Sequence, residues 1–524
     1  MDPTLEPPTS GHAATGVAVA AEAESPTGPK RILAVLTQLS MMNVAIGVGG
    51  VVRNKVMAVY LKPAGFGEFT QIAGIAMAIY VFVQFGMAVG LSRHAAAHRE
   101  PKQRQRQLSV ANSLTEGLSV ATILLLVPAL FSSASNPVLR GLGVVPSFAD
   151  KVILAVLLAV APLEALRNNY LCFLQGILDI RGMSIKRSVA ILVSTAVAVP
   201  LIALFREEGA AAQMAFGTLF LAVLLGLRCR QMGFRPLAFA WDKRIAFTLA
   251  GWGGATLISN FALSSTDTLI RGHLIATAGL AANGLYQSAS LLSGQVMAII
   301  LGSIGAYSLA TLSETKDTTV AKLRLTDLLR VILPITTLSL GALGLLSIPL
   351  LSILFTRTFG QAATFFPLQL GANYFQAVAW IVGAPLLGFG FVRTWMFIQL
   401  AGSALRYVLT MWLSSFIGVH AVPAGLWLAI AFDLAANVVF CRRQLGITFD
   451  APIIRTFLLG GAGILTCAVV GCSSHSLILF FATAILLCGI VAAMAWRESK
   501  GMVHIAISRY RRFANRRLRA KFPS

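Results

Sequence analysis

The sequence has few charged residues for its length and lacks the common signatures of metal and nucleotide sites. Of its 524 residues 12% are charged and 56% are hydrophobic, whereas soluble domains carry about 25% charged residues. Its six cysteines form no CxxC pair, so neither a disulfide framework nor a zinc site is indicated. No HExxH and no GxxxxGK[ST] stretch occurs. We therefore expect neither a metal centre nor an ATP-driven transporter, and we expect no cofactor.

The sequence instead contains many apolar runs of about 20 residues, the length that an α-helix needs to cross the hydrocarbon core. This pattern predicts an all-α polytopic membrane protein with about 14 transmembrane helices. The expected spans are 32–60, 69–92, 109–131, 152–174, 188–205, 210–227, 246–275, 284–312, 328–355, 362–388, 394–417, 422–441, 456–471 and 475–496.

Lysine and arginine are distributed unevenly between the connections. Counted from the N-terminal segment, every second connection is basic, and together these hold 32 of the 42 cations, whereas the others hold five. Because cytoplasmic loops carry the excess of Lys and Arg, we predict that both termini lie in the cytoplasm. The net charge of +22 then reflects orientation in a membrane, and no nucleic-acid partner is expected.

The opening of the chain resembles a later stretch at an offset of 216 residues. Aligning 54–73 with 270–289 places Lys55 opposite Arg271, and each copy joins a charged helix to the next helix through a short Gly/Ala-rich turn. The pattern predicts two parallel six-helix repeats, and transporters of this design usually bind substrate between them. The predicted parts are a disordered tail (1–30), an N-lobe (31–230), a C-lobe (231–445), two further helices (446–497) and a basic tail that lies on anionic lipid (498–524).

Nine ionisable residues fall within the expected spans, where they are costly and usually face a protein interior or a water-filled cavity. Two local pairs, Asp267–Arg271 and Glu164–Arg167, have the spacing at which opposite charges on a helix can neutralise each other. Arg406 has no acid within four positions. The nine are Arg53, Lys55, Arg167, Arg271, Arg406, Glu116, Glu164, Asp267 and Asp433.

Arg53 and Lys55 admit two interpretations. They lie two residues apart, about 200° around a helix, so both cannot face one cavity squarely. They also lie near the expected outer end of the first span, where long cations can extend to the water interface. Either they line a cavity for an anion or they mark this interface. For Arg406, Asp433 on the following span is a candidate partner.

Several stretches resemble one family of transporters. NKVMAVYLKPAGFGEFTQI (54–72), VQFGMAVGLSRHAAAH (83–98) and DTLIRGHLIATAGLAANGLYQSASLL (267–292) resemble oligosaccharide-lipid flippases of the multidrug/oligosaccharidyl-lipid/polysaccharide (MOP) exporter superfamily, in particular its Wzx-type branch. The pair of helices at 456–496 departs from the twelve-helix members of that branch. Peptidoglycan-precursor flippases of the same superfamily have fourteen helices.

The resemblance implies a non-enzymatic flippase of the bacterial cytoplasmic membrane. Its substrate would be an undecaprenyl-diphosphate-linked oligosaccharide, moved from the inner to the outer leaflet for lipopolysaccharide O-antigen or exopolysaccharide synthesis, among membrane lipids and beside a polymerase and a chain-length regulator. We expect a cationic cavity to bind the diphosphate and buried acids to couple transport to H⁺ or Na⁺. The cations are Arg53, Lys55, Arg271 and Arg406, and the acids are Glu116, Asp267 and Asp433.

Two other functions remain open. A multidrug cation antiporter of the same superfamily shares the architecture but should present acids to its substrate, whereas cations outnumber acids five to four in the expected spans. A membrane polymerase, ligase or acyltransferase needs a large outer loop or a cluster of histidines and acids. The longest expected outer loop, 132–151, has a single acid, Asp150, and no histidine.

Overall fold

The computed structural model describes residues 29–98, 100–313, 318–473 and 478–494, and all regular elements in these ranges are helices. The predicted tails, 1–30 and 498–524, lie outside these ranges apart from the first two residues of the first helix. The elements are α1 (Pro29–Val83), α2 (Met87–Ala97), α3 (Pro101–Phe131), α4 (Ser135–Gly141), α5 (Phe148–Ala159), α6 (Ala161–Gly176), α7 (Ile180–Gln231), α8 (Lys243–Ser313), α9 (Thr318–Leu345), α10 (Ser347–Leu354), η1 (Arg357–Phe365), α11 (Phe366–Gly388), α12 (Val392–Ile417), η2 (Gly418–His420), α13 (Ala421–Leu445) and α14 (Ala451–Ser473).

Eight segments of the described chain are long and apolar enough to cross a membrane. Four of them contain two crossings each. The helices α1, α7 and α8 break at Lys62, Arg206 and Gly279, where φ is positive, and α12 and α13 are separated at Gly418. With the α5–α6 pair and the shorter apolar helix Ile478–Met494, the described chain has fourteen candidate crossings, the number that the sequence predicts.

The breaks in α1 and α8 have local causes and related positions. In α1, Lys62 has φ 57° and Pro63 follows it; proline has no N–H with which to continue the helical hydrogen bonds. In α8, Gly279 takes φ 86°, which costs glycine little. Residues 62 and 279 are 217 positions apart, close to the offset of the internal repeat. The two predicted six-helix repeats therefore begin with the same broken pair of helices.

The two repeats touch each other where these pairs cross. A Cβ atom on Gly67 would lie 2.1 Å from the carbonyl oxygen of Leu280, and one on Gly284 would lie 1.9 Å from that of Pro63. Asn283 donates a hydrogen bond to the carbonyl of Gly67 at 2.7 Å, across 216 residues of sequence. The backbones of α1 and α8 thus meet directly at equivalent positions of the repeat.

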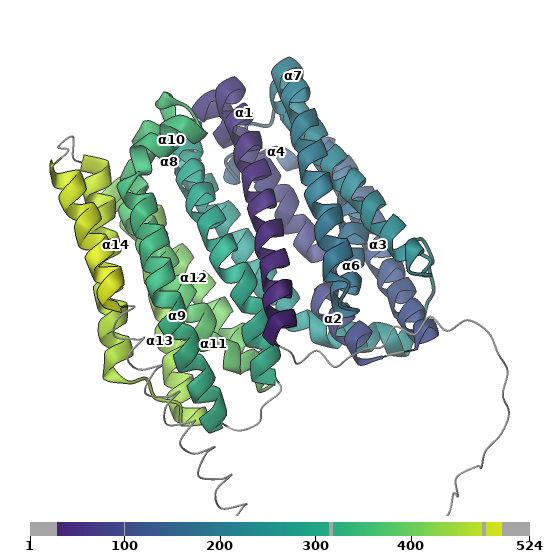
Figure 1. The fold of residues 1–524 in the computed structure, drawn as a ribbon. Coiled ribbons are helices and arrows are strands. Elements are labelled where there is room, and N and C mark those ends of the chain that lie inside the picture. The colour runs from purple at the N-terminus through teal and green to yellow at the C-terminus, as the bar shows by residue number, and fades with distance from the viewer. Residues whose placement is uncertain (1–28, 99, 314–317, 474–477, 495–524) are drawn as a thin grey trace, which may run out of the picture.

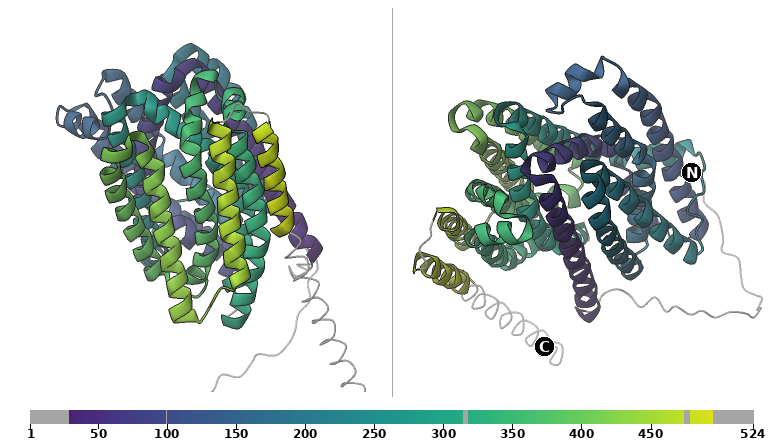
Figure 2. Two further views of the ribbon diagram at one scale, coloured as in Figure 1. Left: turned by 90° about the vertical axis from the view of Figure 1, so that its left-hand side faces the viewer. Right: turned by 90° about the horizontal axis from the view of Figure 1, so that it is seen from above.

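The helices run roughly parallel in two neighbouring groups (Figure 1). The N-terminal helices α1–α7 form one group and α8–α14 the other, and a view along the helices shows them side by side (Figure 2). Helix α14 lies at the far edge against α9. We propose that α1–α7 and α8–α13 correspond to the N-lobe and the C-lobe that the sequence predicts.

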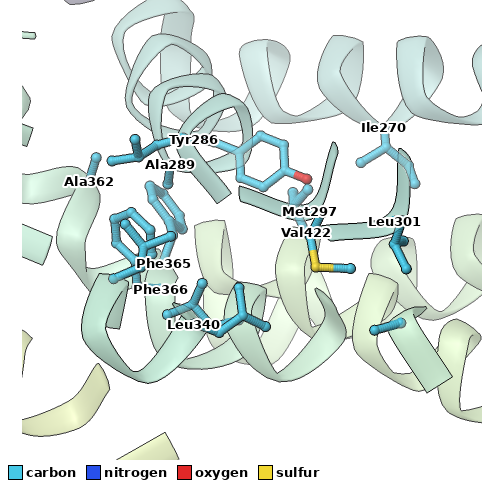
Figure 3. Packing of buried hydrophobic residues seen from close by; sticks show 14 of the residues in the cluster. Ile270, Tyr286, Ala289, Met297, Leu301, Leu340, Ala362, Phe365, Phe366 and Val422 are labelled. Carbon is cyan, nitrogen blue, oxygen red and sulfur yellow. The ribbon is translucent and has the colours of Figure 1, made fainter. Parts of the chain in front are cut away.

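A continuous hydrophobic core extends from α1 to α14. At its centre the rings of Phe66, from α1, and Phe359, from η1, meet edge to face at 5.7 Å between centroids. Tyr286 on α8 meets Phe365 in the same way at 5.8 Å, and Figure 3 shows Tyr286 among Phe365, Phe366 and Met297. This packing fixes the middle of α8, which carries the charged residues described next.

Candidate functional site

Three ionised side chains meet where α8 packs against α12. Oδ1 of Asp267 lies 2.7 Å from Nη2 of Arg406, and Oδ2 lies 3.4 Å from Nε of Arg271. The arginine side chains are 5% and 8% exposed, whereas that of Asp267 is 38% exposed. We call these residues the Asp267 triad. It holds two cations and one anion, so its net charge is +1. Asp267 is the member of the triad that other groups can reach, because it is the one that is partly exposed.

Helix α1 completes the surroundings of Arg271. Its Nη1 donates to the carbonyl of Thr70 at 3.1 Å, and a Cβ atom on Gly74 would lie 2.2 Å from Nη2. In the amide orientation that satisfies both of its polar atoms, Gln287 accepts hydrogen bonds from Nε and Nη1 of Arg271 at 3.2 and 3.1 Å. The guanidinium is therefore fixed between the two repeats, and it fits there because residue 74 has no side chain.

The partner of Arg406 differs from the candidate that the sequence suggested. Arg406 binds Asp267, 139 residues away, and Tyr286 also lies beside it. Asp433 on α13 instead lies against Gly402, where a Cβ atom would be 2.3 Å from its Oδ1. Within the described part of the chain, that Oδ1 is buried and accepts no hydrogen bond.

The two cations of α1 have different environments. Nζ of Lys55 donates to the carbonyl of Phe355, between α10 and η1, so Lys55 stabilises the end of a neighbouring helix. For Arg53 the described residues supply no hydrogen-bond partner to its buried Nε. The structure brings neither residue to the Asp267 triad, and their role in binding a substrate stays a prediction.

The acids of the N-terminal half lie in a polar interior. Oε1 of Glu116 on α3 is buried and has no hydrogen-bond partner among the described residues. Its neighbour Thr115 accepts from Asn169 on α6 at 2.9 Å. The predicted pair of Glu164 with Arg167 forms at 2.6 Å. A coupling role for Glu116 stays a prediction, and no group of His, Cys, Asp and Glu in the described ranges could hold a metal ion.

Three residues that contact the triad, Thr70, Gly74 and Gln287, are not among the predicted site residues. Thr70 contacts Arg271 through its backbone carbonyl, and Gly74 leaves room for the guanidinium because it has no side chain. Neither contact uses a side chain that could be recognised in the sequence. At the repeat offset of 216 residues Gln287 aligns with Gln71, which itself donates to the carbonyl of Thr268 on α8 at 3.1 Å. Glutamines at equivalent positions of both repeats were the one sequence signal for this polar crossing.

No family model matches the chain, but its fold is that of transporters of the MOP superfamily. It superposes on the lipid II flippase MurJ in an inward closed conformation with a TM-score of 0.68, at 12% identity over 89% of this chain and 99% of that chain. An outward-facing MATE multidrug resistance transporter of the MOP superfamily gives a TM-score of 0.59 at 15% identity over 79% and 95% of the two chains.

A similarity in sequence points to one kind of member. The chain is 23% identical over 374 residues to the lipid III flippase of Escherichia coli (strain K12), which covers 71% of this chain and 88% of that flippase. The lipid III flippase of Shigella flexneri gives the same values. The predicted resemblance to flippases of the MOP superfamily is thereby confirmed.

Proposed function

We propose that this protein is a flippase that moves an undecaprenyl-diphosphate-linked oligosaccharide from the inner to the outer leaflet of the bacterial cytoplasmic membrane. The observation that carries the proposal is the similarity to lipid III flippase along 88% of its length, on a fold shared with a lipid II flippase. The product would serve O-antigen or exopolysaccharide synthesis, with a polymerase and a chain-length regulator as partners.

The Asp267 triad supports an anionic substrate. A diphosphate cannot cross hydrocarbon without a substitute for its hydration, and arginine can pair with phosphate oxygens through two parallel hydrogen bonds. Asp267 pairs with both arginines, and its exposed side is where phosphate oxygens would compete for them. Translocation needs no bond to be made or broken, so we propose a non-enzymatic transporter.

The internal repeat supports a mechanism of alternating access. Rocking of one repeat against the other would open the triad to each leaflet in turn. We propose that this motion pivots at the close crossing of Gly67 and Gly284. We propose that H⁺ or Na⁺ drives the cycle through Glu116 and Asp433, whose buried oxygens lack hydrogen-bond partners within the described ranges.

The test is complementation of a flippase-deleted bacterium that accumulates lipid-linked oligosaccharide. We expect the wild type to restore polymer, and Arg271→Ala and Arg406→Ala to lose it at equal expression. Lys55→Ala tests whether the contact with Phe355 is needed, and Arg393→Ala, an exposed cation at the start of α12, is the matched control. Full activity of both triad variants would remove the triad from the mechanism.

A second candidate is a multidrug cation antiporter. The MATE transporters share the fold, and the unpartnered oxygens of Glu116 and Asp433 could attract a cation. Efflux of a fluorescent cation from a drug-sensitive strain separates the two functions. Efflux that is lost in Glu116→Gln or Asp433→Asn, together with failure to restore polymer in several flippase-deleted strains, would favour the antiporter.

A further inference from the structure

A second charged site lies at one end of the bundle, away from the Asp267 triad. It is a pocket of about 410 Å³ between the end of α2, the start of α3 and the first turns of α8. Figure 1 shows α2 at the end of the bundle where α1 begins. The polar side chains that line the pocket include His94, His98, Arg106, Gln107, Asp242 and Arg244. A volume of this size is typical of small-ligand sites.

The one acid that lines the pocket is already neutralised. Oδ1 of Asp242 accepts the backbone N–H groups of Arg244 and Ile245 at 3.0 and 3.2 Å, which caps the start of α8. Its Oδ2 pairs with Arg106 at 2.7 Å. The described residues of 93–106 and 242–244 contain six Lys or Arg and two acids, so the surroundings are strongly positive even with neutral histidines.

The histidines add hydrogen-bond donors to this positive field. The rings of His94 and His98 stack with centroids 6.0 Å apart. Nδ1 of His98 lies 3.0 Å from the carbonyl oxygen of His94 and 3.0 Å from Nε2 of Gln107. The two contacts need opposite roles of Nδ1, because the carbonyl of His94 can only accept and Nε2 of Gln107 can only donate. When Gln107 donates to Nδ1, the proton of the neutral ring lies on Nε2, where it can be donated to a phosphate oxygen. Arg244 is exposed, so its guanidinium can turn toward an anion.

We propose that this pocket binds a phosphate group through Arg244 and His98, with Arg106 beside them. Arginine and imidazolium are strong donors to phosphate oxygens, and the two acids of the region, Asp242 and Glu100, are outnumbered. The position at the end of the bundle suits the headgroup of an anionic lipid, whereas a soluble phosphate or diphosphate offers the same chemistry. This inference does not depend on which substrate the protein transports.

The occupant would connect the two halves of the molecule. His98 follows α2, whereas Arg244 lies on the first turn of α8. Close to the pocket the halves also touch through backbone, because a Cβ atom on Gly86 would lie 2.0 Å from the carbonyl oxygen of Gly253. A phosphate held between α2 and α8 would therefore stabilise contact between the halves at this end, whichever substrate lies between them.

The experiment is a binding titration on the full-length protein in neutral detergent. Dioctanoyl phosphatidic acid is the lipid probe, inorganic pyrophosphate the soluble probe, and dioctanoyl phosphatidylcholine the zwitterionic comparison. We expect saturable binding of phosphatidic acid that weakens at least tenfold in Arg244→Gln and in His98→Gln. Arg443→Gln, which removes an exposed cation after another span, is the matched control and should bind like the wild type. Gel filtration and thermal unfolding show that each variant is folded.

The soluble probe identifies the source of the phosphate. Competition by pyrophosphate at concentrations similar to those of the lipid would identify a site for soluble phosphates, and binding of the lipid alone would identify a headgroup site; both support a phosphate pocket. Three results would overturn it. The first is no binding of either probe by the wild type, and the second is unchanged binding in both pocket variants. The third is a loss of binding in Arg443→Gln as large as in the pocket variants, which would show that only the net charge of the protein attracts the lipid.

Discussion

Asp267 is the residue on which the charge balance of the candidate site depends, because it binds two buried arginines at once. We predict that Asp267→Asn lowers the thermal stability and abolishes complementation. Removing one partner of a buried ion pair typically costs about 3–5 kcal/mol, and the partial exposure of Asp267 reduces the expected loss to about 2 kcal/mol. Thermal unfolding in detergent measures the change. Asp450→Asn, from an exposed pair with Lys322, should leave the melting temperature almost unchanged, and an equal fall in both would contradict the prediction.

A double variant separates the structural role of the triad from its role in transport. We expect Asp267→Asn combined with Arg406→Gln to recover part of the stability that Asp267→Asn loses, because one unpaired cation then disappears with its partner. Neighbouring residues couple in this way by about 0.5–3 kcal/mol. Polymer synthesis should nevertheless stay absent, since Arg406 and the shared counter-charge are gone and only Arg271 remains. A double variant that restores stability and polymer together would show that the triad is only structural.

His94 gives the molecule a pH dependence beyond the end of its second span. Burial, and then the charges of His98 and Arg93, lower the pKa of the His94 ring from its ordinary value of 6.5. As the pH falls through 6.5, the unfolded chain therefore binds more protons than the folded chain does. The folded state loses stability in that range. We predict that the melting temperature falls between pH 7.5 and pH 5 by less in His94→Gln than in the wild type. An identical fall in both proteins would show that His94 does not contribute.

At the scale of helices, the number of crossings was predictable and their contacts were not. The length of the apolar runs predicts the crossings, because a bilayer requires about 20 residues for each, and Pro63 and Gly279 mark the two matching breaks. Local spacing also predicts the contact of Asp267 with Arg271. The bond of Arg406 to Asp267 and that of Lys55 to Phe355 join residues 139 and 300 positions apart. Such contacts depend on how the helices pack against one another. The hydropathy of a single span carries no information about that packing.

The crossing of α1 and α8 leads to a prediction about helix packing. We expect Gly67→Ala to weaken complementation strongly, because its Cβ would lie 2.1 Å from the carbonyl of Leu280 and would force the helices apart. Gly254→Ala in α8 is the control, since its Cβ meets no atom within 4 Å. Replacing a helical glycine by alanine without a clash typically stabilises a helix by about 0.5–1 kcal/mol. Expression, melting temperature and polymer are compared for both, and equal behaviour would show that the close contact is unimportant.

For the whole molecule, the charged groups fall into two sets with different surroundings. The two arginines of the Asp267 triad are buried between the helices of the two repeats, whereas the phosphate pocket opens at one end of the bundle. Figure 1 places that end beside the start of α1. If the positive-inside rule holds for this chain, the pocket faces the inner leaflet, from which a flippase takes its substrate. Orientation therefore decides which leaflet the pocket meets.

Orientation can be measured with single cysteines in a variant whose six native cysteines are replaced. Arg357→Cys lies at the start of η1 and Arg443→Cys near the end of α13, and both positions are exposed. Since Arg357 lies in a connection with few cations and Arg443 in a basic one, we predict that a membrane-impermeant maleimide labels Arg357→Cys in intact cells. Arg443→Cys should react only after the cells are permeabilised. The reverse pattern would place the basic end outside, and the phosphate pocket could then no longer meet lipid headgroups of the cytoplasmic leaflet.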